Sequence, residues 1–146
     1  MAHYVTRIPV SVTRSAAFAY LSRFDRAAEW DPGVEASEML TPEPVGIGSR
    51  FHLVSRFLGR RIPLDYEIVE HDRDERIVLR AENRSVRSVD TITFRDDELG
   101  TVVVYDAQLD AKGIGRLAEP LLGIVFHRIG DRAAAGLRTR LSAVQA

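Results

Sequence analysis

Polar and apolar residues alternate with a period of two along most of the chain, which is typical of β-strands that bury one face. Short polar or glycine-containing segments separate these runs, and connections of that length favour antiparallel hairpins. The pattern therefore predicts an antiparallel sheet. Its predicted strands are 3–10, 34–40, 49–58, 62–69, 76–82, 86–94 and 101–111.

Two segments follow a helical period instead. Thr13 is a suitable cap for a short helix from Arg14 to about Phe24, and residues 25–30 can add another turn before Asp31-Pro32-Gly33 ends it. A longer amphipathic helix is predicted over 114–144, after the last strand. Its broad apolar face is made of Ala118, Leu121, Val125, Ile129, Ala133 and Leu137.

One long helix laid across a sheet is not expected to fill the whole interior with side chains, so we expect a cavity between the two. Gly123, Gly130 and Gly136 weaken the helix by about 1 kcal/mol each relative to alanine. Packing must hold such a helix, and its small residues permit a close approach. The approaching group is either a ligand or the protein's own sheet, and the sequence leaves both open.

Composition narrows the function classes. The chain has 146 residues, which suits one domain over 1–146, and its 45% hydrophobic and 28% charged residues are ordinary for a globular protein. The net charge is -1 without a basic stripe, so a nucleic-acid partner is not expected. Cysteine is absent, which excludes thiolate chemistry. No apolar run approaches the ~20 residues that span a bilayer, so we expect a cytoplasmic protein without membrane insertion.

Five local patterns accompany this order of elements: 30–34 (WDPGV), 46–51 (GIGSRF), 90–94 (DTITF), 100–105 (GTVVVY) and 112–113 (KG). With them, the whole chain resembles the polyketide cyclase/dehydrase branch of the START-like (SRPBCC) superfamily. The resemblance implies an α+β helix-grip fold, in which a seven-stranded antiparallel sheet wraps around a long C-terminal helix and two short helices follow the first strand. It also implies a deep hydrophobic cavity. It does not by itself imply a reaction.

Asp90 is the sharpest candidate for chemistry. If Ile92 and Phe94 face the helix, strand parity places Asp90 on the same face, where partial desolvation raises a carboxyl pKa toward values useful for proton transfer. Asp90 is thus a candidate catalytic residue. The alternative is a structural salt bridge, with Arg80, Arg87 or a helix arginine, or a position open to water.

The other candidate ligand-binding residues follow from the same parity. Tyr66 and Tyr105 offer hydroxyls within an apolar wall, and Trp30 either lines the cavity or packs the short helices onto the sheet. On the third strand the parity is undecided, because Phe51 and Leu53 compete with His52 for the inner face. The complete predicted set is Trp30, Phe51, Leu53, Tyr66, Ser88, Asp90, Tyr105, Leu121 and Val125.

Metal and cofactor signatures are weak. His3, His52, His71 and His127 show no metal-ligand spacing, so we expect no metal and no cofactor. The segment 113–118 matches the dinucleotide fingerprint Gly-x-Gly-x-x-Ala, but that motif needs a strand after its helix, and the chain has none there.

Two function classes remain. The first is a carrier or sensor that binds a hydrophobic polyketide, lipid or aromatic compound between the sheet and the helix. The alternative is an enzyme resembling a polyketide cyclase or dehydratase, which folds its substrate in the cavity with acid–base assistance from Asp90 and a tyrosine. The single predicted inward carboxylate favours the binder. An exposed edge of the sheet also leaves a homodimer open.

Overall fold

A computed structural model of the chain describes residues 2–57, 59–98, 100–112 and 119–144, without the side chains of 119–122 and 143–144. The predicted strands and helices are present. In chain order the elements are β1 (Ala2–Val10), α1 (Arg14–Ser22), a 3-10 helix (Phe24–Arg26), α2 (Ala27–Trp30), β2 (Val34–Met39), β3 (Arg50–Phe57), β4 (Arg60–Asp72), β5 (Arg76–Glu82), β6 (Val86–Asp97), β7 (Gly100–Ala111) and α3 (Glu119–Val144).

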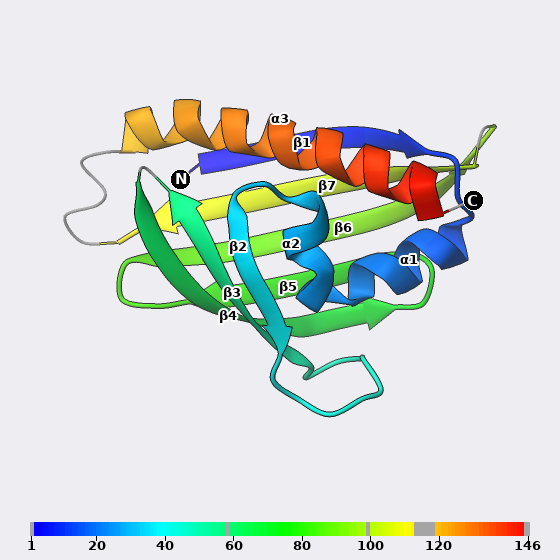
Figure 1. Ribbon diagram of the computed structural model, residues 1–146, viewed down its shortest axis with the longest axis horizontal. Helices are drawn as coiled ribbons and strands as arrows, with labels where there is room; N and C mark the ends of the chain where they lie inside the picture. Colours follow the sequence, from blue (N-terminus) through cyan, green and yellow to red (C-terminus); the bar gives the residue numbers. More distant parts are fainter. Residues whose placement is uncertain (1, 58, 99, 113–118, 145–146) are drawn as a thin grey trace.

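The seven strands form one antiparallel sheet in the order β1-β7-β6-β5-β4-β3-β2. β1 pairs with β7, although the two are far apart in sequence, and β2 forms the opposite edge. Register shifts at Val34/Ala36 in β2 and Ile68/Glu70 in β4 are β-bulges, which bend strands and increase their twist. The sheet curls as a result, and its concave face receives the helices (Figure 1). The α+β helix-grip fold is confirmed.

The helices divide the concave face between them. α3 lies along β1 and contacts α2 near its C-terminal end, whereas α1 and α2 cover the other part of the sheet (Figure 1). The main core lies beneath α1 and the 3-10 helix, where Phe18 meets Phe94 and Phe24 meets Phe51 edge to face. Edge-to-face contact is a favourable geometry for aromatic pairs.

Local signals set most helix ends. Thr13 caps α1, since its hydroxyl accepts the Ala16 N–H at 3.1 Å. α1 ends at Ser22, earlier than predicted, because residues 24–26 tighten into the 3-10 helix. After α2, the Asp31 side chain accepts the Gly33 N–H at 2.8 Å and closes the expected turn.

β4 is longer than the sequence pattern predicts. The segment at His71 was expected to be a turn, yet β4 continues to Asp72 and His71 pairs with Ile77. The reason is the bulge between Ile68 and Glu70, which shifts the alternation of inward and outward side chains and so hides the continuation from a period-of-two analysis.

Candidate ligand cavity

A cavity of about 330 Å³ lies between the concave face of the sheet and α3, where the sequence predicts one. Its volume is at the lower end of the ~300–1,000 Å³ typical of small-molecule sites. Most of the lining is apolar. It comprises Tyr4, Thr6, Ile8, Trp30, Asp31, Gly33, Ser55, Arg56, Phe57, Ile62, Leu64, Tyr66, Ser85, Val86, Ser88, Asp90, Tyr105, Ala107, Leu109, Ala111, Phe126, Ile129, Gly130, Ala133, Ala134 and Leu137.

Four side chains form a polar cluster in this apolar lining. The Tyr105 hydroxyl donates to Asp90 Oδ2 at 2.6 Å. The hydroxyls of Tyr66 and Ser88 are 2.8 Å apart and share a hydrogen bond. All four residues line the cavity. We call Tyr66, Ser88, Asp90 and Tyr105 the polar cluster.

Strand register brings the polar cluster together. Ser88 and Asp90 alternate on the inner face of β6, and their partners on β7 are Leu109 and Ala107. Tyr66 comes from β4, beyond β5, and must reach across one strand to meet Ser88. The residue paired with Ser88 on β5 is Ala81, whose small side chain leaves the space that this reach requires.

Asp90 is only 8% exposed as a residue. Burial raises the pKa of Asp90 to about 7, against the opposing effect of the Tyr105 hydrogen bond, and the negative charges of Asp31 and Asp106 act in the same direction as burial. Burial and the nearby Asp90 charge also raise the pKa values of Tyr66 and Tyr105, so both hydroxyls keep their protons. The polar cluster thus holds an acid that changes protonation near neutrality.

Asp31 is a second carboxyl in the cavity, and the sequence analysis missed it. It was interpreted only as part of the turn that ends α2. Burial raises the pKa of Asp31 to about 6, while the Gly33 N–H opposes this shift. The preceding residue, Trp30, packs edge to face against Tyr105 with ring centroids 5.9 Å apart, which holds this turn beside the polar cluster. The available signal was an acidic residue directly after a predicted cavity residue.

The structure brings five predicted residues to the cavity lining: Trp30, Tyr66, Ser88, Asp90 and Tyr105. Among the described residues, no arginine forms an ion pair with Asp90, and Arg87 pairs with Glu82 instead. Ala107 and Leu109 also line the cavity, as the parity of β7 predicts.

Phe51 and Leu53 face inward but do not line the cavity. They are 0% and 3% exposed and belong to the core, because Phe24 of the 3-10 helix covers this part of β3. Further along the same face, Ser55 and Phe57 do reach the lining. His52 points outward and bonds Asp65 at 2.6 Å, which resolves the parity of the strand.

The helix face is also rotated relative to the prediction. Val125 is half-buried and absent from the lining, whereas Phe126, Ile129 and Gly130 belong to it. The predicted row has a residue at about every fourth position, which is slightly more than the 3.6 residues of one helical turn. The row therefore winds around α3 and leaves the inner face toward the N-terminal end of the helix. The side chain of Leu121 and the whole segment 113–118 lie outside the described residues.

Two helix glycines are approached by the protein itself. A Cβ on Gly136 would lie 1.9 Å from the carbonyl oxygen of Trp30, and one on Gly130 would lie 2.6 Å from the Tyr4 ring. The sheet, through Tyr4 of β1, is therefore the approaching group at Gly130, whereas at Gly136 it is α2, which is neither of the two expected alternatives. The cavity lies beside these contacts, next to Ala133 and Ala134.

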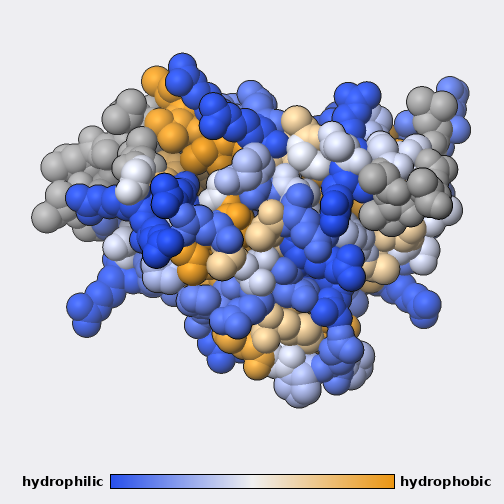
Figure 2. Space-filling model, in the orientation of Figure 1, coloured by the Kyte–Doolittle hydropathy of each residue, from blue (hydrophilic) through white to orange (hydrophobic). Residues whose placement is uncertain are grey.

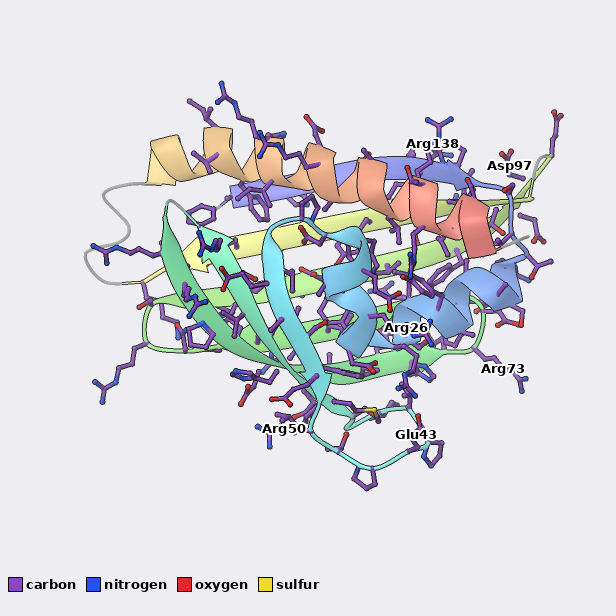
Figure 3. The ribbon with its side chains drawn as sticks, in the orientation of Figure 1. Arg26, Glu43, Arg50, Arg73, Asp97 and Arg138 are labelled. Atoms are coloured by element: carbon purple, nitrogen blue, oxygen red, sulfur yellow. The ribbon has the colours of Figure 1, made fainter. Side chains whose placement is uncertain are left out.

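Several charged side chains project into solvent. The visible face is mostly hydrophilic with separate hydrophobic patches (Figure 2), and Arg50, Arg73, Asp97 and Arg138 project from the surface (Figure 3). Within the described part of the chain, no three histidine or acidic side chains gather as a metal site requires. None of the described helices has the length and apolar character to cross a bilayer.

Comparison with protein families gives a match over residues 1–142 to the family described as polyketide cyclase/dehydrase and lipid transport. The chain belongs to this family. No curated protein sequence matches it.

Solved structures show the same fold at low sequence identity. A START superfamily protein from Mycobacterium smegmatis superposes with a TM-score of 0.83 at 12% identity over 99% of both chains. A protein from Thermus thermophilus gives 0.82 at 18% identity over 99% of both chains. The ZhuI aromatase/cyclase from Streptomyces sp. R1128 gives 0.78 at 14% identity over 95% of this chain and 92% of the other. The START-like fold and the family support a ligand-binding or cyclase role.

Proposed function

We propose that the protein binds a hydrophobic small molecule between the sheet and α3, as a carrier or sensor of a polyketide, lipid or aromatic compound. The observation that carries the proposal is the apolar cavity of about 330 Å³ with a single polar cluster in its wall. An apolar wall gains about 25 cal/mol for each Å² of apolar surface that it removes from water. A few placed polar groups then orient the ligand.

The protein contains its own reporter for this test. Trp30 is the only tryptophan, and it lines the cavity. N-phenyl-1-naphthylamine is a neutral apolar probe that accepts excitation energy from tryptophan and emits strongly in apolar surroundings. We expect saturable probe emission on excitation of Trp30. Failure of the folded protein to bind this probe or other neutral apolar compounds would contradict the proposal.

Two neighbouring alanines provide matched variants for the same titration. Ala134 lines the cavity, whereas Ala135 is exposed on the opposite side of α3. Ala134→Leu places extra volume in the cavity and should weaken probe binding at least about tenfold. Ala135→Leu adds the same atoms outside and should leave binding unchanged. Equal effects of the two variants would move the binding site away from the cavity.

Native mass spectrometry of freshly purified protein tests whether the cavity already holds a ligand. Extra mass that disappears on denaturation, and that is absent from Ala134→Leu, would supply the chemical class of the ligand. The same extra mass in both proteins would indicate binding elsewhere.

A second candidate function, a cyclase- or dehydratase-type enzyme, is favoured by the 2.6 Å bond between Tyr105 and Asp90 and by the near-neutral pKa of Asp90. In this proposal the Asp90 carboxylate takes a proton from the carbon next to a ketone. The electron pair of that C–H bond moves toward the carbonyl oxygen, and a hydroxyl of Tyr66 or Tyr105 hydrogen-bonds the developing enolate.

Proton abstraction can be measured without knowledge of the natural substrate. 2-Tetralone, a bicyclic ketone, exchanges its α-protons in D₂O, and NMR follows the rate. The enzyme proposal expects acceleration above buffer that Asp90→Asn abolishes while probe affinity is retained. Exchange at the buffer rate, or acceleration that survives Asp90→Asn, would leave the binding role as the better supported one.

A further inference from the structure

The charges inside the cavity are unevenly distributed. Three described lining residues carry a carboxyl or guanidinium group: Asp31, Asp90 and Arg56. The guanidinium of Arg56 donates to Glu35, and the Arg56 side chain is 64% exposed. The cation therefore lies at the rim and is already paired. The two acids come from the inner elements instead, Asp31 from the turn after α2 and Asp90 from β6. α3 contributes only uncharged groups to the described lining.

The protein also leaves part of the hydrogen-bond acceptor capacity of the two carboxyl groups unused. Oδ1 of Asp31 accepts the Gly33 N–H at 2.8 Å, and no described donor reaches its other oxygen. Oδ2 of Asp90 accepts the Tyr105 hydroxyl, and hydrogen bonding from the neighbouring Ser88 hydroxyl also lowers the pKa of this carboxyl. No cation pairs with either carboxyl among the described residues. Carboxylate oxygens accept several hydrogen bonds each, so the cavity presents acceptor capacity without matching donors.

From this arrangement we propose that Asp31 and Asp90 select hydrophobic ligands that carry a hydrogen-bond donor, a hydroxyl or a protonated amine, and reject ligands that carry a carboxylate. This inference rests on the proposed binding function and specifies its ligand class. A hydroxyl or ammonium group on the ligand would donate hydrogen bonds to the carboxylate oxygens of Asp31 and Asp90 in the cavity wall. A ligand carboxylate would instead bring a third acidic group into a region of low dielectric, where like charges repel strongly.

The raised pKa values agree with this inference. Burial raises the pKa of Asp31 to about 6 and that of Asp90 to about 7, and the negative charges of Asp31 and Asp106 raise the pKa of Asp90 further. At about pH 8 both carboxyls are mostly ionised. A ligand anion would then face its greatest repulsion, and a protonated amine its greatest attraction.

Matched naphthalenes provide the test at about pH 8. The probes are 2-naphthylmethanol, 2-naphthylmethylamine and 2-naphthoate, which share one ring system and differ in the polar group. Each is used to displace N-phenyl-1-naphthylamine from the wild-type protein. We expect the alcohol and the amine to displace it at concentrations at least about tenfold lower than naphthoate.

Variants assign the selectivity to the two acids. In the double variant Asp31→Asn with Asp90→Asn, the disadvantage of naphthoate should fall below about threefold. Each single variant should show part of this effect and provides the same comparison if the double variant does not fold. Asp97→Asn is the control, because Asp97 projects from the surface and does not line the cavity, and it should preserve the full discrimination.

The possible failures are distinguishable. If N-phenyl-1-naphthylamine and the neutral naphthalene alcohol both fail to bind, the proposed binding function is overturned together with this inference. If the probe binds and naphthoate displaces it as well as the alcohol does, only the selectivity is overturned. Discrimination that persists in a folded double variant would also overturn the role of these two acids.

Discussion

One sheet supports a solid core at one end and a cavity at the other. In the solid part, α1 and the 3-10 helix present Phe18, Leu21 and Phe24 to the strands, and these side chains fill the space. In the hollow part, α3 presents the small residues Gly130, Ala133 and Ala134 between the larger Ile129 and Leu137. The inward alternation of the strands is the same in both parts. The size of the helix side chains therefore decides where space remains.

The two parts also treat polar groups differently. Asp90 is the only acidic residue classed as buried in the described chain, and it lies in the hollow part with Ser88. In the rest of the interior the buried polar residues are small hydroxyls with close partners, such as Thr101, which donates to the Val12 carbonyl. Close packing leaves no room for an incompletely satisfied carboxyl, whereas a cavity provides it.

The largest expected difference between the two parts comes from truncation. Phe51→Ala in the solid core should lower the free energy of unfolding by about 3–5 kcal/mol, because Phe51 is 0% exposed and its removal leaves a void. Leu109→Ala in the cavity wall should cost about 1 kcal/mol, since Leu109 already borders empty space. Urea unfolding of both variants measures this. Equal losses would mean that the two parts are packed alike.

The next effect is the response of stability to pH. The folded pKa of Asp90 is about 7, above the ordinary value of 3.8, so the folded state binds this proton more tightly than the unfolded state. Stability from this group is present below about pH 4 and is lost as the pH rises through about 7. Asp90→Asn removes this loss. Relative to wild type, the variant should therefore gain about 3 kcal/mol between about pH 4 and about pH 8.

Urea midpoints across that pH range provide the measurement. Asp31 remains in the variant and retains its own slope up to about pH 6, in the same direction. A difference between the two proteins that stays constant with pH would show that Asp90 is not buried as a near-neutral acid. The Asp97→Asn control, which removes a surface carboxyl outside the cavity, should track the wild type.

A smaller effect concerns the contact that positions α3. Gly136→Ala directs a methyl group at the Trp30 carbonyl and should destabilise the protein by about 2 kcal/mol, despite the better helix propensity of alanine. Gly123→Ala is the matched control, because no atom of the described neighbouring residues lies within 4 Å of its added Cβ, and propensity alone should stabilise it by up to about 1 kcal/mol. Thermal unfolding distinguishes the two. Similar shifts would indicate that α3 does not dock against α2.

Much of this comparison could be predicted from local patterns. Strand alternation was sufficient to place Ser88, Asp90 and Tyr105 on one face, because β6 and β7 keep their period through the cavity. The same argument was ambiguous for β3, where His52 and Val54 put bulky side chains on the outer face as well. Periodicity decides a facing only when the two faces differ in polarity.

The remaining features depend on tertiary placement. Phe51 was included in the cavity set although the facing of its strand was undecided. It does face inward, but the sequence does not show that Phe24 packs over it. Asp31 was missed for a related reason: the turn Asp31-Pro32-Gly33 has a sufficient local explanation, and only packing of Trp30 against Tyr105 brings its carboxyl to the cavity. Sequence periodicity predicts which face of the sheet a side chain occupies. It does not predict which other element packs against that side chain.

The smallest expected effect provides the most direct test of whether the hollow part is empty. Ala134→Leu adds three carbons toward the cavity and should change the free energy of unfolding by less than about 1 kcal/mol, because the added carbons enter open space. Ala17→Leu adds the same atoms to a position on the buried face of α1 that is 0% exposed, where overpacking typically costs about 1–3 kcal/mol. Urea unfolding in the absence of ligand compares the two variants. A large loss for Ala134→Leu would mean that the space beside α3 is filled by the protein's own side chains in solution, and both the binding function and its selectivity would then need another site.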